Sequence, residues 1–222
     1  MKILSNLGLF FLLLCQIGIA SAEDLNITPH HDTTTGNWLI RLRALAVVPD
    51  EKSSSISIIG GRVSDISSTV VPELDFSYFF TKNIASELIL ATTRHSVKAT
   101  RTALGPLDLG KVSLLPPTLT IQYHFFEPEH KVRPYVGAGI NYTLFYHDDA
   151  GPVASSISYE NSFGPVLQAG LNIGLNEHFS INFDVKKVYI DSDVHVRALD
   201  SSMKTHVDIN PVLYAIGIGY HF

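Results

Sequence analysis

The chain has 222 residues, a formal net charge of −5 at pH 7, and 17% charged and 10% aromatic residues. The acidic balance argues against nucleic acid as a partner, because nucleic-acid-binding domains are usually basic. The only cysteine, Cys15, lies in an N-terminal apolar run, so the rest of the chain has no thiol with which to form a disulfide.

The N-terminal residues have the pattern of a secretory signal peptide. Lys2 precedes an apolar run over residues 3–19, and the small residues Ala-Ser-Ala follow at 20–22. A membrane anchor is the alternative, but the run is short and ends in a cleavage site. We therefore expect residues 1–22 to be a cleaved signal peptide. Beyond them, no apolar run is long enough for a transmembrane helix.

Residues 23–36 are polar and contain proline and glycine, which predicts a periplasmic N-terminal arm. Within it, His30, His31 and Asp32 form a candidate metal site. No fourth ligand has a matching spacing, so we favour a solvated arm and expect no metal and no cofactor.

The first predicted strand covers about residues 38–48, where the side chains alternate between two faces. A period of two is typical of a β-strand. Arg41 and Arg43 lie on the same face. If this strand crosses lipid, both arginines must face inward, because charge facing hydrocarbon is costly.

The next two predicted strands, about residues 71–80 and 84–93, form a hairpin with a tight turn at 81–83. This turn places Phe76 opposite Leu88, and both belong to the apolar face. The agreement of the faces across the turn supports the register.

The most regular alternation lies in residues 117–146, where two runs of about ten residues flank a charged, proline-containing turn at 127–131. Ten residues is the length that a tilted strand needs to cross a bilayer. A soluble hairpin would turn its apolar face to a protein core, and a transmembrane hairpin would turn it to lipid. Three further strands are predicted at about 163–175, 179–189 and 207–222.

The connections between these strands alternate in length. Turns after the second, fourth and sixth strands are short, and the remaining connections are long loops at residues 49–69, 94–115, 147–161 and 191–205. In an antiparallel arrangement all short turns fall at one end, as in outer-membrane barrels. An even strand number also lets the last strand pair with the first, which removes the open edges that hydrocarbon does not tolerate.

We therefore predict an all-β fold: an eight-stranded antiparallel transmembrane β-barrel over residues 37–222, with short periplasmic turns and long extracellular loops. A soluble periplasmic sandwich would not need this asymmetry. The chain ends on Phe222, an aromatic terminus that we expect the barrel-assembly machinery to read. We expect a monomer in contact with outer-membrane lipid.

Inward positions of the predicted barrel carry polar and charged side chains of both signs. The candidates to line the lumen are Arg41, Arg43, Glu73, Asp75, Glu87, Gln122, His124, Asn182, Asp184 and Lys186. We favour a structural network that plugs the narrow lumen over a polar constriction that lets small solutes pass. Inward glycines near the periplasmic end, beside large residues such as Tyr135, predict a packed periplasmic end and a wider outer end.

Apolar residues of the long loops are candidates for the mouth of a pocket at the outer end. They are Ile56, Ile58, Ile59, Leu107, Leu109 and Leu114. Packing of these residues against one another to order the loops is an equal alternative. Pro116 and Pro117 are candidates for a lateral opening, because proline gives no amide hydrogen to a sheet.

Several segments resemble the OmpW family: residues 38–50, 72–93, 115–146 and 217–222, among which LPPTLTIQYHF and RPYVGAGINYTLF are specific. The resemblance implies an eight-stranded barrel in the outer membrane of a Gram-negative bacterium. It also implies passage of small hydrophobic molecules, and it carries no catalytic residues. The alternatives are a structural or receptor barrel, whose loops bind host, phage or bacteriocin proteins, and an outer-membrane enzyme. No serine, histidine and acid spacing favours the enzyme.

Overall fold

The computed structural model describes residues 37–50, 52–53, 62–102, 105–150, 156–198 and 201–222. The expected signal peptide and N-terminal arm lie outside these residues, as do Ile56, Ile58 and Ile59. No helix in the described part is long and apolar enough to cross a membrane. The strands are β1 (Trp38–Val48), β2 (Lys52–Ser53), β3 (Arg62–Ile66), β4 (Thr69–Phe79), β5 (Ile84–Leu90), β6 (Thr93–Thr102), β7 (Gly105–Leu115), β8 (Thr118–His124), β9 (Val132–Ala150), β10 (Ser156–Tyr159), β11 (Ser162–Gly174), β12 (Phe179–Val188), β13 (Asp191–Ala198), β14 (Ser201–Asp208) and β15 (Val212–His221).

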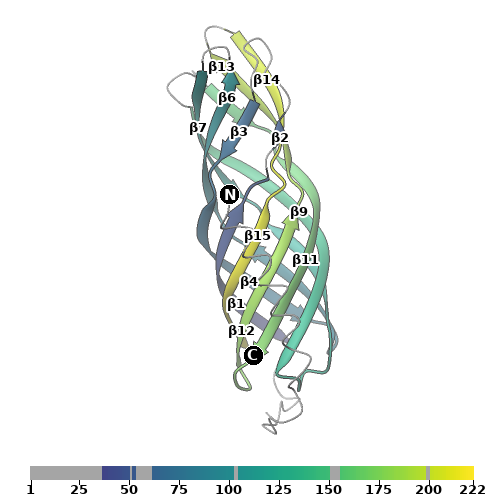
Figure 1. The fold of residues 1–222 in the computed structure, drawn as a ribbon. Coiled ribbons are helices and arrows are strands. Elements are labelled where there is room, and N and C mark those ends of the chain that lie inside the picture. Colours follow the sequence, from purple (N-terminus) through teal and green to yellow (C-terminus); the bar gives the residue numbers. More distant parts are fainter. Residues whose placement is uncertain (1–36, 51, 54–61, 103–104, 151–155, 199–200) are drawn as a thin grey trace. The chain divides into compact units, whose positions relative to one another are not determined.

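Eight of these strands close into an antiparallel barrel in the order β1, β4, β5, β8, β9, β11, β12 and β15 (Figure 1). The last strand returns to the first, with Leu39 opposite His221 and Val48 opposite Val212. Closure leaves no open edge among these strands, so their backbone groups pair within the sheet, as a hydrocarbon environment requires. The predicted fold class is confirmed.

The two faces of the barrel strands differ in polarity as the alternation predicts. On β1, Arg41 is fully buried, whereas the side chain of the next residue, Leu42, is 63% exposed. Across the first hairpin, Phe76 lies opposite Leu88, as the tight turn predicts. Apolar residues on the outside and buried polar residues inside are the reverse of the arrangement in a soluble barrel. This arrangement fits a barrel surrounded by lipid.

The turns at the periplasmic end are held by their own side chains. Asn176 Oδ1 accepts hydrogen bonds from the amides of His178 and Phe179, at 3.0 and 2.8 Å. Thr81 Oγ1 accepts from the amides of Asn83 and Ile84, at 3.3 and 3.0 Å. Short polar side chains that bond to the backbone in this way favour tight turns over continued strands.

The segments predicted as long loops contain further strands. Residues 94–115, expected to be a loop, form most of β6 and β7, which pair with each other and with β3 and the outer part of β9. A second small sheet has the order β10, β13, β14 and β2. Figure 1 shows β3, β6, β7, β13 and β14 gathered at the end opposite the C-terminus.

The start of the last barrel strand also differs from the prediction. The strand begins at Val212 rather than Val207, which belongs to β14. Asn210 between them has a positive φ of 36°, and Pro211 follows. A left-handed residue followed by a proline interrupts the strand, because neither continues a regular ladder.

Candidate functional site

The ten residues predicted to line the lumen all lie inside the barrel, and none of them is more than 2% exposed. We call this set the polar layer. They come from five strands, β1, β4, β5, β8 and β12, so that the layer crosses the barrel rather than following one wall. Buried charges are tolerated only when they are paired and hydrogen-bonded.

Arg41 is bound by residues of two neighbouring strands. Its Nε donates to Asp75 Oδ1 at 2.7 Å, and its Nη2 donates to Glu87 Oε1 at 2.7 Å and to Ser77 Oγ at 2.8 Å. The β1–β4 register places Arg41 directly opposite Asp75, which explains why the two meet. The fork of the guanidinium suits this kind of multiple contact.

Arg43 lies one pleat further along β1 and bonds in the same manner. Its Nε donates to Glu73 Oε1, its Nη2 to Glu87 Oε1 at 2.9 Å, and its Nη1 to Asn182 Oδ1 at 3.1 Å. On the other side of β1 its register partner is Gly217. A Cβ there would lie 2.6 Å from Arg43 Cα and 2.7 Å from Arg43 Cγ, so a glycine is needed for the Arg43 side chain to pass.

Gln168 on β11, which is not among the predicted lumen residues, links Glu87 on β5 to Asp184 on β12. Its Nε2 donates to Glu87 Oε2 and to Asp184 Oδ2, both at 2.7 Å. Gln122 Nε2 donates to the same Glu87 oxygen at 2.7 Å. The alternation along β11 could have identified it, because Gln168 lies two residues before Gly170 and therefore on the same inward face. Lys186 completes the layer with an ion pair to Asp184.

Aromatic rings, among them that of His124 from the polar layer, fill the periplasmic end of the barrel. His124 stacks on Tyr135 with ring centroids 4.8 Å apart, and Phe79 lies 4.9 Å from His124. Tyr135 OH donates to Asp184 and accepts from Asn182 Nδ2 at 3.1 Å. A Cβ on Gly170 would collide with the Tyr135 ring. This arrangement agrees with the packed periplasmic end that the inward glycines predict.

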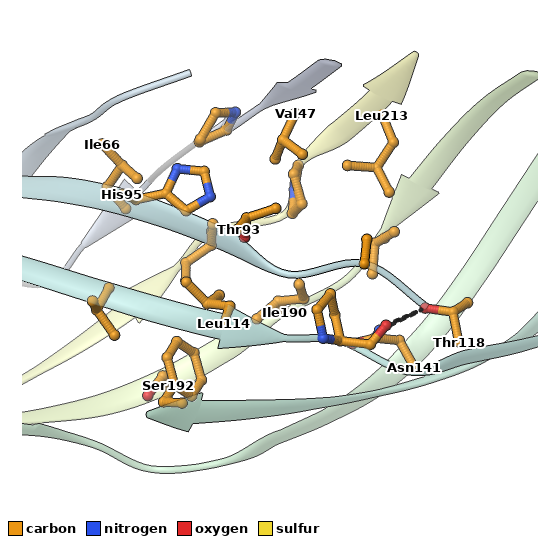
Figure 2. Close-up of a pocket in the computed structure, with 18 of the residues that line it drawn as sticks. Val47, Ile66, Thr93, His95, Leu114, Thr118, Asn141, Ile190, Ser192 and Leu213 are labelled. Carbon is orange, nitrogen blue, oxygen red and sulfur yellow. Dashed lines mark hydrogen bonds between the residues drawn. The ribbon is translucent and has the colours of Figure 1, made fainter. Parts of the chain in front are cut away.

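On the outer side of the polar layer, the structure contains a cavity of about 970 Å³, including the part that opens to solvent. We call it the outer cavity. Its wall is mainly aliphatic and combines barrel strands with their extracellular extensions: Leu45, Val47, Ile89, Ala91, Val97, Val112, Leu114, Val188, Ile190, Val194 and Val207. Figure 2 shows side chains from several strands turned toward this common space.

The predicted mouth residues divide among several positions. Leu114 lines the outer cavity, and Leu109 is buried in an apolar cluster with Val97 and Val112. Leu107 lies on β7, but its side chain is outside the described part. Most of the wall comes instead from inward positions near the outer ends of barrel strands, such as Val47. The sequence signal for these residues is the alternation of inward and outward side chains, which continues along each strand beyond the inward polar residues.

A few polar side chains also line the outer cavity. Asn141 Nδ2 donates to Thr118 Oγ1 at 2.7 Å, the bond drawn in Figure 2. His95 Nδ1 lies 2.6 Å from the carbonyl oxygen of Ser67. Burial lowers the pKa of His95, and its bond to Ser67 opposes this only in part. The imidazole is therefore neutral at neutral pH.

Pro116 and Pro117 lie between β7 and β8 at the side of the outer cavity. Toward β9 the sheet continues, since the Tyr142 amide donates to Pro117 O at 3.1 Å. Toward β5 and β6 the ladder stops after the Ile89–Thr118 pair and resumes only at the Thr93–Leu114 pair. Two prolines in this interval leave two amide donors missing from the sheet.

A family model matches residues 34–222, and its description is the OmpW family. The chain belongs to this family. An uncharacterized outer-membrane protein of Sinorhizobium fredii, y4mB, is 39% identical over 210 residues, which cover 91% of this chain and 90% of that protein. Outer membrane protein W of Vibrio cholerae is 31% identical over 212 residues, covering 92% and 97% of the two chains.

Among solved structures, the crystal structure of the outer membrane protein OprG from Pseudomonas aeruginosa matches with a TM-score of 0.78 and 30% identity, covering 85% of this chain and 96% of that chain. This OmpW-family chain is therefore a protein of the Gram-negative outer membrane. Its short turns face the periplasm and its long connections face the outside, as in other barrels of this class.

Proposed function

We propose that this OmpW-family barrel passes small hydrophobic molecules across the outer membrane by a lateral route. The molecule enters the outer cavity from the outside, is stopped by the polar layer, and leaves through the barrel wall beside Pro116 and Pro117 into the bilayer. The outer cavity above a filled polar lumen is the observation that carries this proposal.

The polar layer is a poor path for an apolar molecule. Arg41, Arg43 and Glu87 are held in place by several hydrogen bonds each, and none of them is more than 2% exposed. An apolar solute that crossed this layer would have to displace those bonds without replacing them, which costs a large desolvation penalty. The aliphatic wall above the layer offers no such penalty.

The seam at Pro116 and Pro117 interrupts the wall beside the outer cavity. Pro116 itself lines the cavity, and the ladder toward β5 and β6 is interrupted beside it. Separating two strands normally breaks a row of backbone hydrogen bonds. At this seam fewer bonds have to break, so a small solute can pass between the strands at a lower cost.

A more distant relative supports an apolar substrate. It is 27% identical over 190 residues, covers 83% of this chain, and is named dibenzothiophene metabolism operon protein PahQ of Pseudomonas aeruginosa. Dibenzothiophene is a flat, uncharged aromatic compound. The proposal also includes a monomeric barrel in contact with lipid, recognised by the assembly machinery through its last strand and Phe222, with small hydrophobic solutes as its other partners.

The test replaces both prolines with valine in P116V/P117V, which restores the amide donors that the two prolines lack. We expect slower entry of 1-N-phenylnaphthylamine, whose fluorescence rises in an apolar phase, into the membrane of intact cells. The control is P72V, because Pro72 is exposed on the outer face of β4 and lies away from the outer cavity. Equal rates in all three correctly folded proteins would count against a lateral exit.

A receptor role is the competing function. In a receptor barrel, deleting the β13–β14 hairpin would abolish binding of a phage or bacteriocin protein, and entry of the apolar probe would not depend on the barrel. If the barrel has no effect on entry of the apolar probe, the transport proposal fails and the receptor role is favoured.

A further inference from the structure

The outer cavity is aliphatic on its walls but not on its inner end, where two charged residues of the polar layer line it. These are Glu73 on β4 and Lys186 on β12, each 1% exposed. A cavity built for a pure hydrocarbon would gain nothing from buried charges at its end, because an apolar molecule cannot satisfy them.

Glu73 has one oxygen engaged and one unused. Its Oε1 accepts from Arg43 Nε, whereas its buried Oε2 has no hydrogen-bond partner among the described residues. A buried carboxylate oxygen without a donor is costly, so a group that donates to it is favoured at this position. The ammonium of Lys186 has three donors, of which the pair with Asp184 uses one.

Two other polar side chains of the wall, Asn141 and Thr118, are already committed to the protein. Asn141 Nδ2 donates to Thr118 Oγ1, and Asn141 Oδ1 accepts from Thr143 Oγ1 at 2.6 Å. Thr118 Oγ1 in turn donates to Pro116 O at 3.0 Å. Glu73 Oε2 is therefore an acceptor at the inner end of the cavity that a bound molecule can use.

The charge of the surroundings restricts the kind of donor. The polar layer holds four carboxylates, Glu73, Asp75, Glu87 and Asp184, against three cations, Arg41, Arg43 and Lys186, so its formal charge is 3 − 4 = −1. An excess of buried negative charge disfavours an anionic head group such as a carboxylate. An uncharged hydroxyl can donate without adding charge to the layer.

We propose that Glu73 is a head-group site of the outer cavity and that its ligands are uncharged apolar molecules ending in a hydroxyl, which donates to Glu73 Oε2. This inference rests on the proposed function and deepens it, because it names the substrate class. Hydrocarbons without the hydroxyl still enter the cavity, but they bind less tightly.

The test compares two probes of nearly the same shape, 2-naphthol and 2-methoxynaphthalene, which differ in the donor hydrogen. Binding is measured by the probe's own fluorescence with the full barrel in lipid nanodiscs, and the signal from empty nanodiscs is subtracted. Because a hydrogen bond to a charged acceptor is among the stronger ones, we expect 2-naphthol to bind roughly tenfold more tightly than its methyl ether.

Variants then assign the preference to its residue. E73Q removes the charged acceptor at similar size, and we expect the preference for 2-naphthol to fall below about threefold. The matched control is E127Q, since Glu127 is an exposed carboxylate of the turn at 127–131 that does not line the cavity. E127Q is expected to keep the preference.

The outcomes separate this inference from the proposed function. Equal binding of both probes by the wild-type barrel overturns the head-group site and leaves the apolar cavity standing. Binding of neither probe above the empty nanodiscs overturns both. The wild-type comparison needs no variant, so it decides the matter even if E73Q does not fold. An undiminished preference in a folded E73Q barrel also overturns the assignment to Glu73.

Discussion

Arg43 and Glu87 lie 44 residues apart in the chain and meet inside the barrel, where Arg43 Nη2 donates to Glu87 Oε1 at 2.9 Å. The same oxygen accepts from Arg41 Nη2 at 2.7 Å. One carboxylate therefore bridges two guanidiniums, and its other oxygen accepts from Gln122 and Gln168. Glu87 is the most connected residue of the polar layer, and the layer's stability depends on its charge.

We expect E87Q to destabilise the barrel by about 3–5 kcal/mol, the usual cost of removing one partner from a buried ion pair. The new amide can keep its oxygen toward Gln122 and Gln168, but its NH2 group then faces the donors of Arg41 and Arg43. The measurement is urea unfolding in phospholipid vesicles. The control is D149N, because the Arg94–Asp149 pair is more than half exposed and should contribute at most about 1 kcal/mol. An equal midpoint for wild type and E87Q would contradict this description of the layer.

Gly170 gives a second prediction on stability. A Cβ there would collide with the Tyr135 ring and would lie 2.7 Å from the carbonyl oxygen of Phe183. We expect G170A to cost about 1–3 kcal/mol by overpacking, measured by the same unfolding assay. At Gly174 the nearest atom to a new Cβ is Lys131 O at 3.8 Å, so G174A should be close to neutral. Similar losses in both variants would mean that general strand propensity, and not the fit of Tyr135, requires the glycines.

The extracellular pair of His206 and Asp193 should depend on pH. Asp193 Oδ1 lies 2.8 Å from His206 Nδ1, and this hydrogen bond is the main reason that the pKa of His206 is raised above its usual value. A raised pKa in the folded state stabilises the protein below the unfolded value of about 6.5 and stops doing so as the pH rises through the folded value. The β13–β14 hairpin should therefore exchange its amide hydrogens faster above that range, beyond the intrinsic rise of exchange with pH.

The variant D193N tests the cause of this shift. Without the carboxylate, the pKa of His206 should fall toward 6.5, as measured by NMR titration of the imidazole in the lipid-embedded barrel. An unchanged titration midpoint in D193N would show that another neighbour raises the pKa.

The alternation of side chains was enough to predict the barrel. Strand β1 was predicted at its observed bounds, and the Phe76–Leu88 register followed from the turn at 81–83. Lipid enforces this pattern, because each outward residue must be apolar and each charge must face inward. The pairing of Arg41 with Asp75 and of Arg43 with Glu73 comes from the β1–β4 register, which the turn at 81–83 does not fix.

The extracellular strands could not be recognised in the same way. In β6, Thr93, His95 and Val97 are buried while Arg94 and Lys98 are exposed, so a period of two is present. Outside the bilayer the outward face is polar, and the segment reads as a loop. The outer cavity could not be predicted for the same reason, because its wall combines barrel strands with these extensions. The contacts of Gln168 join strands that are distant in sequence, so they can be identified only once the closed barrel is known.

The polar layer should also block ions. In planar bilayers we expect the wild-type barrel to give no steady conductance steps, with a trimeric porin as the positive control. The reason is that an ion would have to break the hydrogen bonds of Arg41, Arg43 and Glu87 to pass. Steady steps proportional to voltage would contradict a closed lumen.

The central claim is tested most directly by filling the outer cavity with a larger side chain of the protein. The measurement is the rate at which 1-N-phenylnaphthylamine enters the membrane of intact cells. Ala91 lines the cavity, whereas the neighbouring Leu90 is exposed on the outward face. A91F places a ring in the cavity, and L90F places the same ring toward lipid. We predict that cells with wild-type or L90F barrels take up the probe several-fold faster than cells without the barrel, and that A91F abolishes the difference. Equal rates with A91F and L90F would contradict a route through the outer cavity.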